Sequence, residues 1–383
     1  MKVIRLPRSK VCLGAPLPWN VRDEGGQLLL TKGHVVSSEN QLEQLLARGA
    51  FVDVEEIKAS AQVDAPLEAK KSNAPPNLFA LWESTAEGLR TLLHKPELNP
   101  DFVKQLDDFT ARILKLLDLN VDIAIYRAVR QENQHHFYYG YTHAIHTAVL
   151  CVLLSRHMGW TAPHTVTLAK AALTMNLSIH DLQGQMAAQD TPVKDRQRAD
   201  ILAHPDKTVA LLKQAGVADA DWLTAIAQHH EHLDGHGYPT GCTVITEMAT
   251  ALRVCDVFTA KISPRVLRDA LSPQEAIRQL YREDKGGPIS TAVIREFGIF
   301  PPGDFVKLAS GELGIVVQRT ANAKAPIVAA ITDAQGRQVG KTVRRDSGQA
   351  EFAIVGNASD LALLKRLPPE RLYGFAAVPQ TPR

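Results

Sequence analysis

From residue 77 to about residue 300, the apolar positions repeat with the period of an α-helix. Leu78, Leu81, Trp82, Leu89, Leu92 and Leu93 fall on one helical face, and Phe102, Leu106, Phe109, Ile113, Leu116 and Leu117 fall on another. Residues 148–154 are almost continuously apolar, which indicates a helix buried on all sides. Further helices are expected at 162–176, 195–214, 219–231, 246–262, 272–283 and 289–298. The pattern predicts a helical bundle domain over residues 77–300.

The pattern before residue 77 differs from that of the bundle. Residues 21–30 alternate around a Gly-Gly turn and predict two strands, and residues 51–54 predict another strand. Ser38 with Gln41 is a capping-box signature, which predicts a short helix between the strands at 21–30 and the strand at 51–54. We interpret residues 1–57 as a small α/β or β module with a regulatory or docking role. Residues 58–76 have the proline-rich, polar composition of a linker.

After residue 300 the pattern returns to strands. Residues 305–317 predict a β-hairpin around Ser310-Gly311-Glu312, and residues 327–331 and 351–355 are weaker strand candidates. We therefore expect a C-terminal β extension over residues 301–363, followed by a loosely ordered tail at 364–383. The expected fold class is mainly α: a helical domain with a small N-terminal module and a C-terminal β-hairpin extension.

Composition and charge exclude several classes of protein. Hydrophobic residues make up 45% of the 383 residues, so the chain can bury a core and is not disordered. The net charge of +2 does not favour a nucleic-acid polymer or an acidic membrane as partner. The four cysteines form no CxxC pair, which argues against a disulfide scaffold or a zinc ribbon. No apolar stretch reaches the ~18 residues of a membrane span, so we expect a cytoplasmic protein.

Residues 229–241 carry the most informative motif in the chain, HHEHLDGHGYPTG. This segment resembles the HHExxDGxGYPxG signature of the HD-GYP family and agrees with it at every fixed position. The resemblance extends over about residues 120–318. It implies a helical metal-hydrolase domain of the HD superfamily, in a branch whose members are bacterial phosphodiesterases of cyclic di-GMP.

The resemblance also implies a set of metal ligands. Carried over position by position, the ligands are His143, His204, His229, His230 and Asp256. In the intact family, one metal ion is held by the residues corresponding to His204, His229 and His230, and a second by those corresponding to His143 and Asp256. An adjacent His-Asp pair completes the second set, and its Asp bridges the two metals. Nitrogen and carboxylate ligands suit iron or manganese, with zinc or nickel as alternatives.

The His-Asp pair is missing from the position where the family has it. The family segment AALLHDIGK aligns with residues 171–179, so Met175 stands for the His, Asn176 for the bridging Asp and Ile179 for the Lys. We therefore assign no certain catalytic residue. His180-Asp181 is an alternative pair, but a shift of five residues rotates a helical side chain by about 140°, and a pair at a helix end is the simpler interpretation.

Loss of this pair changes the expected metal content. A thioether and a neutral amide are poor ligands for a second dication, so we expect one metal ion or none. Mononuclear binding and an empty, hydrogen-bonded polar cluster are weighed about equally, and a full two-metal centre is the least favoured. Some members of the family use a Glu one turn before the first His for a third metal. Tyr139 occupies that position here, so no third metal is expected.

Substrate contacts of the family are better preserved than its metal ligands. Basic residues nine and twelve positions after the downstream Asp correspond to Arg265 and Arg268, whose guanidinium groups suit phosphate oxygens. Gly237, Tyr238 and Pro239 are expected to shape the loop over the ligand. The alternative is that the two arginines belong to one exposed helical face.

Two functions from different classes follow. We favour a degenerate HD-GYP protein that binds cyclic di-GMP, or a protein partner through the GYP loop or the N-terminal module, with little or no hydrolysis. The alternative is an active metal-dependent phosphodiesterase that produces pGpG or GMP. The face from Leu78 to Leu93 would allow a homodimer, although burial in the core is the simpler interpretation.

Overall fold

The protein is described from a computed structural model, in two compact units, Met1–Pro75 and Pro76–Arg383. The structure describes residues 3–6, 17, 19–23, 25, 28–30, 45, 50–53, 77–131, 133–358 and 369–373. The expected linker at 58–76 and the expected helix start at Ser38 lie outside these ranges.

The N-terminal unit contains a four-stranded antiparallel sheet. Its strands are β1 (Val3–Arg5), β2 (Val21–Arg22), β3 (Leu28–Leu30) and β4 (Phe51–Asp53), in the order β1-β4-β2-β3. Val21 pairs with Leu30, as the alternation around the Gly-Gly turn predicts. Trp19, Val21 and Val52 are buried in a small core of their own.

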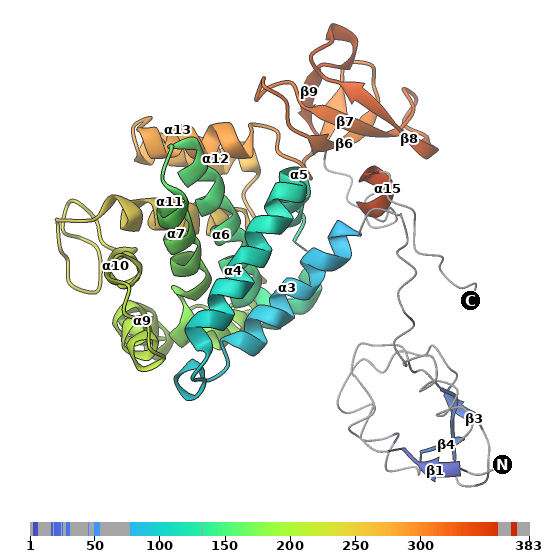
Figure 1. Cartoon of the computed structure of the whole chain (residues 1–383). Helices are drawn as coiled ribbons and strands as arrows, with labels where there is room; N and C mark the ends of the chain where they lie inside the picture. The colour runs from blue at the N-terminus through green and yellow to red at the C-terminus, as the bar shows by residue number, and fades with distance from the viewer. Residues whose placement is uncertain are drawn as a thin grey trace. The chain divides into compact units, whose positions relative to one another are not determined.

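The larger unit is a helical bundle joined to a β sheet (Figure 1), and the mainly α-helical fold is confirmed. Its helices are α3 (Leu78–Leu92), α4 (Phe102–Leu119), α5 (Val121–Val129), α6 (Tyr139–His157), α7 (Ala162–Thr174), α8 (His180–Ala188), α9 (Asp195–Gln214), α10 (Ala220–Gln228), α11 (Glu247–Ile262), α12 (Pro273–Glu283) and α13 (Pro288–Phe297). Short 3-10 turns are η2 (Pro96–Leu98), η3 (Asn133–Tyr138) and η4 (Leu177–Ile179). Within the described ranges, no helix combines the length and apolar character needed to cross a membrane.

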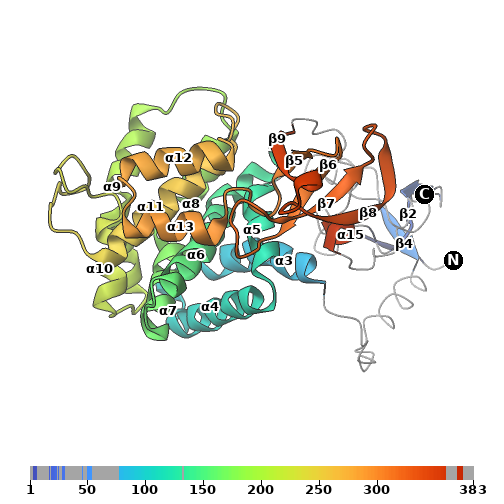
Figure 2. The same cartoon turned by 90° about the horizontal axis from the view of Figure 1, so that it is seen from above.

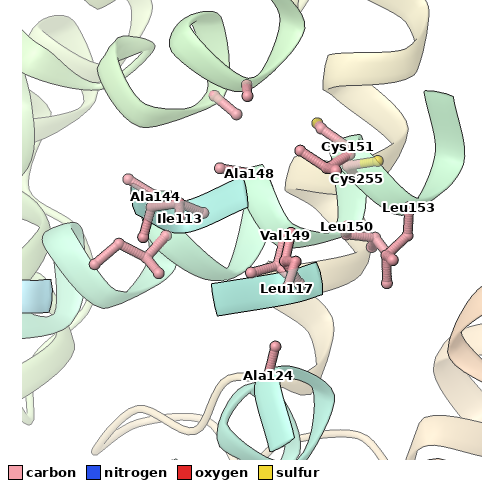
Figure 3. Close-up of a cluster of buried hydrophobic side chains, with 14 of the residues drawn as sticks. Ile113, Leu117, Ala124, Ala144, Ala148, Val149, Leu150, Cys151, Leu153 and Cys255 are labelled. Atoms are coloured by element: carbon pink, nitrogen blue, oxygen red, sulfur yellow. The ribbon is translucent and has the colours of Figure 1, made fainter. Parts of the chain in front are cut away.

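Helix α6 lies at the centre of the bundle, as the apolar run 148–154 predicts. Ala144, Ala148 and Cys151 are fully buried, and their small side chains let neighbouring helices approach closely. Figure 3 shows Ile113 of α4 beside Ala144, and Cys151 beside Cys255 of α11. The face from Leu78 to Leu93 also packs into this core, with Leu78, Trp82, Leu89 and Leu93 buried.

The C-terminal strands form a five-stranded antiparallel sheet, which is larger than the expected hairpin. It contains β5 (Phe305–Leu308), β6 (Leu313–Gln318), β7 (Ile327–Thr332), β8 (Gln338–Asp346) and β9 (Ile354–Asn357), in the order β8-β7-β6-β5-β9, with the 3-10 turn η5 (Ala350–Phe352) before β9. Seen from above, the sheet stands beside α5 at one end of the bundle (Figure 2). The hairpin expected at 305–317 is β5 and β6.

Part of the expected C-terminal tail is ordered. Residues Pro369–Tyr373 form the short helix α15. The Leu372 side chain is buried, and its carbonyl accepts a hydrogen bond of 2.6 Å from Nη2 of Arg344. The Tyr373 ring packs edge-on against Phe79 and Tyr126. These contacts replace the loose tail that we expected for this segment. Two apolar side chains in a short run give no periodic signal from which to predict them.

Candidate metal centre

One pocket collects most of the predicted site residues. Its volume is about 320 Å³, and its walls come from α6, α9, α11 and the segment after α10. Among the residues that line it are His143, Asn176, Ile179, His204, His230, Tyr238, Asp256, Arg265 and Arg268. His229 lies directly behind this wall, fully buried, with its Nε2 3.2 Å from Nε2 of His204. Of the helices that supply these residues, α11 packs against α6, and α10 packs against both α11 and α9 (Figures 1 and 2).

The main chain fixes the orientation of two of the histidines. Pro205 lies inside α9 and has no N–H, so the carbonyl of Ile201, four residues earlier, receives no helical hydrogen bond from it. That carbonyl accepts instead from Nδ1 of His204 at 2.6 Å. His229 stands at the end of α10 and donates from Nδ1 to the carbonyl of Ile226, also at 2.6 Å. Both rings therefore turn their Nε2 atoms into the site.

The two Nε2 atoms form a donor set that suits a metal ion. Burial lowers the pKa of His204 to about 3, and it also lowers the pKa of His229, so both rings are neutral near pH 7. With Nδ1 protonated, each Nε2 carries a lone pair, and no proton lies between them. Their separation is 3.2 Å. Two nitrogens on one tetrahedral ion are about 3.3 Å apart, because each lies about 2.0–2.1 Å from the metal.

His230 completes this three-histidine cluster. Its ring lies 4.0 Å from that of His229 between centroids, and ligand atoms of His204, His229 and His230 all fall within 4.8 Å of one another. Burial and the neighbouring His229 lower the pKa of His230 well below its usual value. Tyr238 stacks on His230 at 4.5 Å and so covers one face of the ring. Three neutral imidazoles around one point can hold one divalent ion and leave coordination positions open.

The other two predicted ligands bind each other. Nε2 of His143 donates to Oδ1 of Asp256 at 2.6 Å, in a buried position. Burial opposes ionisation of Asp256, but the bond to His143 outweighs it and holds the pKa of the carboxyl well below its usual range. A metal ion at this half of the site must displace the shared proton.

The two residues at the position of the expected His-Asp pair lie in different places, one in the pocket and one in the core. Asn176 lines the pocket together with His143 and Asp256, whereas Met175 is fully buried in the hydrophobic core and does not line it. The alternative pair His180-Asp181 also lies outside the pocket lining. His180 stacks on Tyr141 at 4.8 Å, and Oδ1 of Asp181 accepts from the Tyr141 hydroxyl.

The two arginines lie in a turn after α11, not on a helical face. The main chains of Arg265 and Arg268 exchange two hydrogen bonds, and both side chains line the pocket. Arg265 donates from Nε and Nη2 to the hydroxyl of Tyr139, at 3.0 and 2.8 Å. The Tyr139 ring lies parallel to that of His143. Sequence analysis missed this contact, because the two partners are 126 residues apart and neither is marked by a local motif.

The GYP loop is held by its own residues. Oε1 of Glu231 accepts from both the amide and the hydroxyl of Thr240, at 2.8 and 2.7 Å, which closes the loop at its base. The amide of Tyr238 donates to the carbonyl of His230, and the Tyr238–Pro239 peptide bond is cis. This loop projects from the bundle between α10 and α11 in Figure 1. It therefore places Tyr238 over the histidines.

Gly237→Ala is expected to open this loop. A Cβ at Gly237 would lie 2.4 Å from the Cα of Glu231 and from the amide of His232, both main-chain atoms. Such overpacking costs about 1–3 kcal/mol, so we expect a lower melting temperature and loss of the Tyr238 cover. Thermal unfolding measures the first effect. Gly340→Ala is the matched control, because nothing lies within 4 Å of its Cβ position. Equal melting temperatures for the two variants would contradict the close approach.

Part of the chain is similar in sequence to known proteins. A model of the HD domain family matches residues 109–286. "Cyclic di-GMP phosphodiesterase PA4108" of Pseudomonas aeruginosa is 30% identical over 193 residues, covering 47% of this chain and 45% of that protein. "Cyclic di-GMP phosphodiesterase PdeB" of Borreliella burgdorferi is 22% identical over 147 residues, covering 38% of each. The chain thus spans less than half the length of these relatives.

A solved structure is also similar. Bd1817, an HDG"Y"P protein from Bdellovibrio bacteriovorus, aligns with a TM-score of 0.45 and 15% identity over 76% of this chain and 98% of that one.

The family match and the helical site define the class of domain: residues 109–286 match the HD domain. The signature at residues 229–241 resembles that of the HD-GYP family, and part of the chain is similar to two proteins named cyclic di-GMP phosphodiesterases. The three-histidine cluster is suited to hold a divalent metal ion.

Proposed function

We propose that this protein binds cyclic di-GMP at a metal centre reduced to one ion, with little or no hydrolysis. The observation that carries the proposal is the composition of the pocket. Three histidines present neutral nitrogens, while Asn176 stands where the bridging carboxylate belongs. The metal would be iron or manganese, or else zinc or nickel.

The two halves of the site support different metal occupancy. In one half, Nε2 of His204 and of His229 face each other without a proton between them, so an ion removes the repulsion of two lone pairs. In the other half, His143 and Asp256 satisfy each other through a short hydrogen bond. Asn176 adds only a neutral amide there, which cannot neutralise a second dication. We therefore propose occupancy of the three-histidine half only.

The residues around the pocket would bind the nucleotide. Arg265 and Arg268 would donate to phosphate oxygens, as guanidinium groups do. Tyr238 offers an aromatic surface at the mouth of the pocket, against which a purine can stack. A bound divalent ion supplies positive charge to a phosphate oxygen and lowers the pKa of a coordinated water. Without a carboxylate at position 176, the chain would not hold a second metal ion on the opposite side of such a water.

The active phosphodiesterase remains the second candidate. Two observations favour it: His143 and Asp256 still lie in the pocket, and both curated relatives are named cyclic di-GMP phosphodiesterases. Metal analysis of anaerobically purified protein, combined with a hydrolysis assay in added iron and manganese, separates the candidates. One metal ion per chain and no pGpG is the expected result. Two metals with pGpG production, lost in His204→Ala, would establish the second candidate instead.

Arg265→Ala is expected to weaken cyclic di-GMP binding. Loss of a charge-assisted hydrogen bond to phosphate costs about 1.5–3 kcal/mol, or roughly 10- to 100-fold in affinity. Calorimetric titration of the metal-loaded protein measures this. Arg278→Ala is the matched control, because Arg278 is an exposed arginine of α12 outside the pocket. Equal affinities for both variants and the wild type would remove Arg265 from the binding site.

The division of the chain into segments indicates where a protein partner would bind. We propose that residues 1–57 form the regulatory or docking module, 77–300 the HD-GYP-like domain and 301–363 its β extension. A protein partner would reach the chain through the GYP loop or this module. A chain that binds nucleotide without hydrolysing it can report occupancy only through such a contact.

A further inference from the structure

A second pocket lies on the other side of Tyr139 from the metal centre. Its volume is about 360 Å³, and it is formed by α3, α5, η3 and α6. Ala86, Tyr139 and Pro264 provide an apolar wall, and Arg127, Arg130 and His146 provide polar groups. None of the histidines of the metal cluster lines it, nor do Arg265 and Arg268. It is therefore a separate cavity that shares one side chain with the metal pocket.

The polar groups of this second pocket have more donors than acceptors. Within the described residues, Arg127 forms no hydrogen bond or ion pair through its side chain. Nε and Nη2 of Arg130 are buried without an acceptor, and so is Nδ1 of His146. Burial leaves the Arg130 charge poorly solvated and lowers its pKa. A buried guanidinium without acceptors is costly, and an anion beside it would offset that cost.

Among the described residues, the carboxylates near the pocket leave this charge incompletely compensated. Both oxygens of Glu87 are occupied, by the Arg90 guanidinium and the Tyr138 hydroxyl. Glu83 lines the pocket but is exposed to solvent. Asp304 attracts Arg130, yet the two form no ion pair within 4 Å in the described structure. The donors that remain point to a negatively charged ligand with oxygen acceptors.

We propose that this pocket binds a small organic oxyanion, with a phosphate or carboxylate group at Arg127 and Arg130 and an apolar or aromatic body against Ala86, Tyr139 and Pro264. The volume is within the range of small-molecule sites. Burial lowers the pKa of His146 to about 3, so its ring is neutral and offers one donor and one acceptor. The proposal stands independently of cyclic di-GMP binding, because the two ligand sets share only Tyr139.

The test uses the full chain without added metal and four probes: phenyl phosphate, benzoate, pyrophosphate and inorganic phosphate. Titrations are made in an Arg265→Ala/Arg268→Ala background, so that anion binding at the metal pocket does not contribute. Phenyl phosphate or benzoate is expected to bind, and the stronger of the two identifies the anionic group. Arg127→Gln is expected to weaken that binding by about tenfold or more, since one charge-assisted hydrogen bond is lost.

Two further variants keep the result interpretable. Glu83→Gln removes a carboxylate from the lining and is expected to tighten binding severalfold, a change that misfolding cannot produce. Arg278→Gln, on the exposed face of α12, should leave affinity unchanged. No binding by either organic probe, or equal affinity in Arg127→Gln and Arg278→Gln, would overturn the proposal. Binding that is present only before Arg265 and Arg268 are replaced, and that Arg127→Gln leaves unchanged in the otherwise wild-type chain, would assign it to the metal pocket instead.

Discussion

A variant carrying Met175→His and Asn176→Asp is expected to bind a second metal ion and to hydrolyse cyclic di-GMP. Asn176 already lines the pocket beside His143 and Asp256, so a carboxylate there would face the half-site that lacks a negative bridge. A second dication stabilises the charge that develops in the transition state by several kcal/mol. A decrease of about 4 kcal/mol in the activation free energy corresponds to roughly a thousandfold increase in rate. Metal content per chain and the rate of pGpG formation are the two measurements.

Folding must be monitored in this experiment, because Met175 is packed in the core and its replacement places a polar ring there. Asn176→Asp alone avoids that risk and is expected to raise the metal content on its own. His180→Ala, added to the double variant, should leave the second metal in place, since His180 does not line the pocket. If both variants fold and still bind a single ion, the missing bridge is not what limits the centre.

Replacement of His230 by Ala is expected to cause a large loss of metal affinity. The three histidines are the whole ligand set of the half-site that we propose to be occupied. Removal of a partner that only orients a ligand costs about 10- to 100-fold in metal affinity, so removal of a ligand should cost more. Competition with a metal-sensitive chelator dye measures the dissociation constant directly.

The signature offers a matched control two residues away. His232 is exposed and lies outside the pocket, although it belongs to the same run of histidines. His232→Ala should therefore bind metal as the wild type does. Loss of affinity in both variants would indicate that the loop binds metal in a different arrangement, and retention in both would exclude His230 as a ligand. An absence of binding in the wild type would instead support an empty polar cluster.

Much of the fold could be predicted because many of the helices carry an apolar stripe or a capping residue at their start, whereas α5 and α8 were not predicted. The helix expected at 195–214 is α9 with the same bounds, and Thr246 and Ser272 cap α11 and α12 as their residue types suggest. Strand β8 was not predicted, because Gln338–Asp346 is largely polar and exposed, without a buried alternating face. Helix α15 was missed because its stability comes from distant contacts with Arg344 and Phe79.

The candidate site could be predicted only where its residues belong to local sequence motifs. The adjacent histidines and the spacing from Asp256 to Arg265 are local patterns, and the structure brings these residues to one pocket. The direct bond between His143 and Asp256 joins positions 113 residues apart, and no local pattern encodes such a contact. The surplus of hydrogen-bond donors in the second pocket could not be predicted from the sequence either. It arises because Glu87 accepts from Arg90 and Tyr138 rather than from the arginines of the pocket.

The carbonyls of Ile201 and Ile226, which set the histidine rings, have a consequence for how such a centre changes over evolutionary time. Where the outer-sphere partner of a histidine is a carboxylate side chain, it can be lost by one substitution. Here the partners are main-chain atoms, released by Pro205 in one helix and by the end of α10 in the other. Substitutions at 175–179 can therefore accumulate while the three-histidine half keeps its shape. A lineage can abandon catalysis in this way and keep a binding site ready for another use.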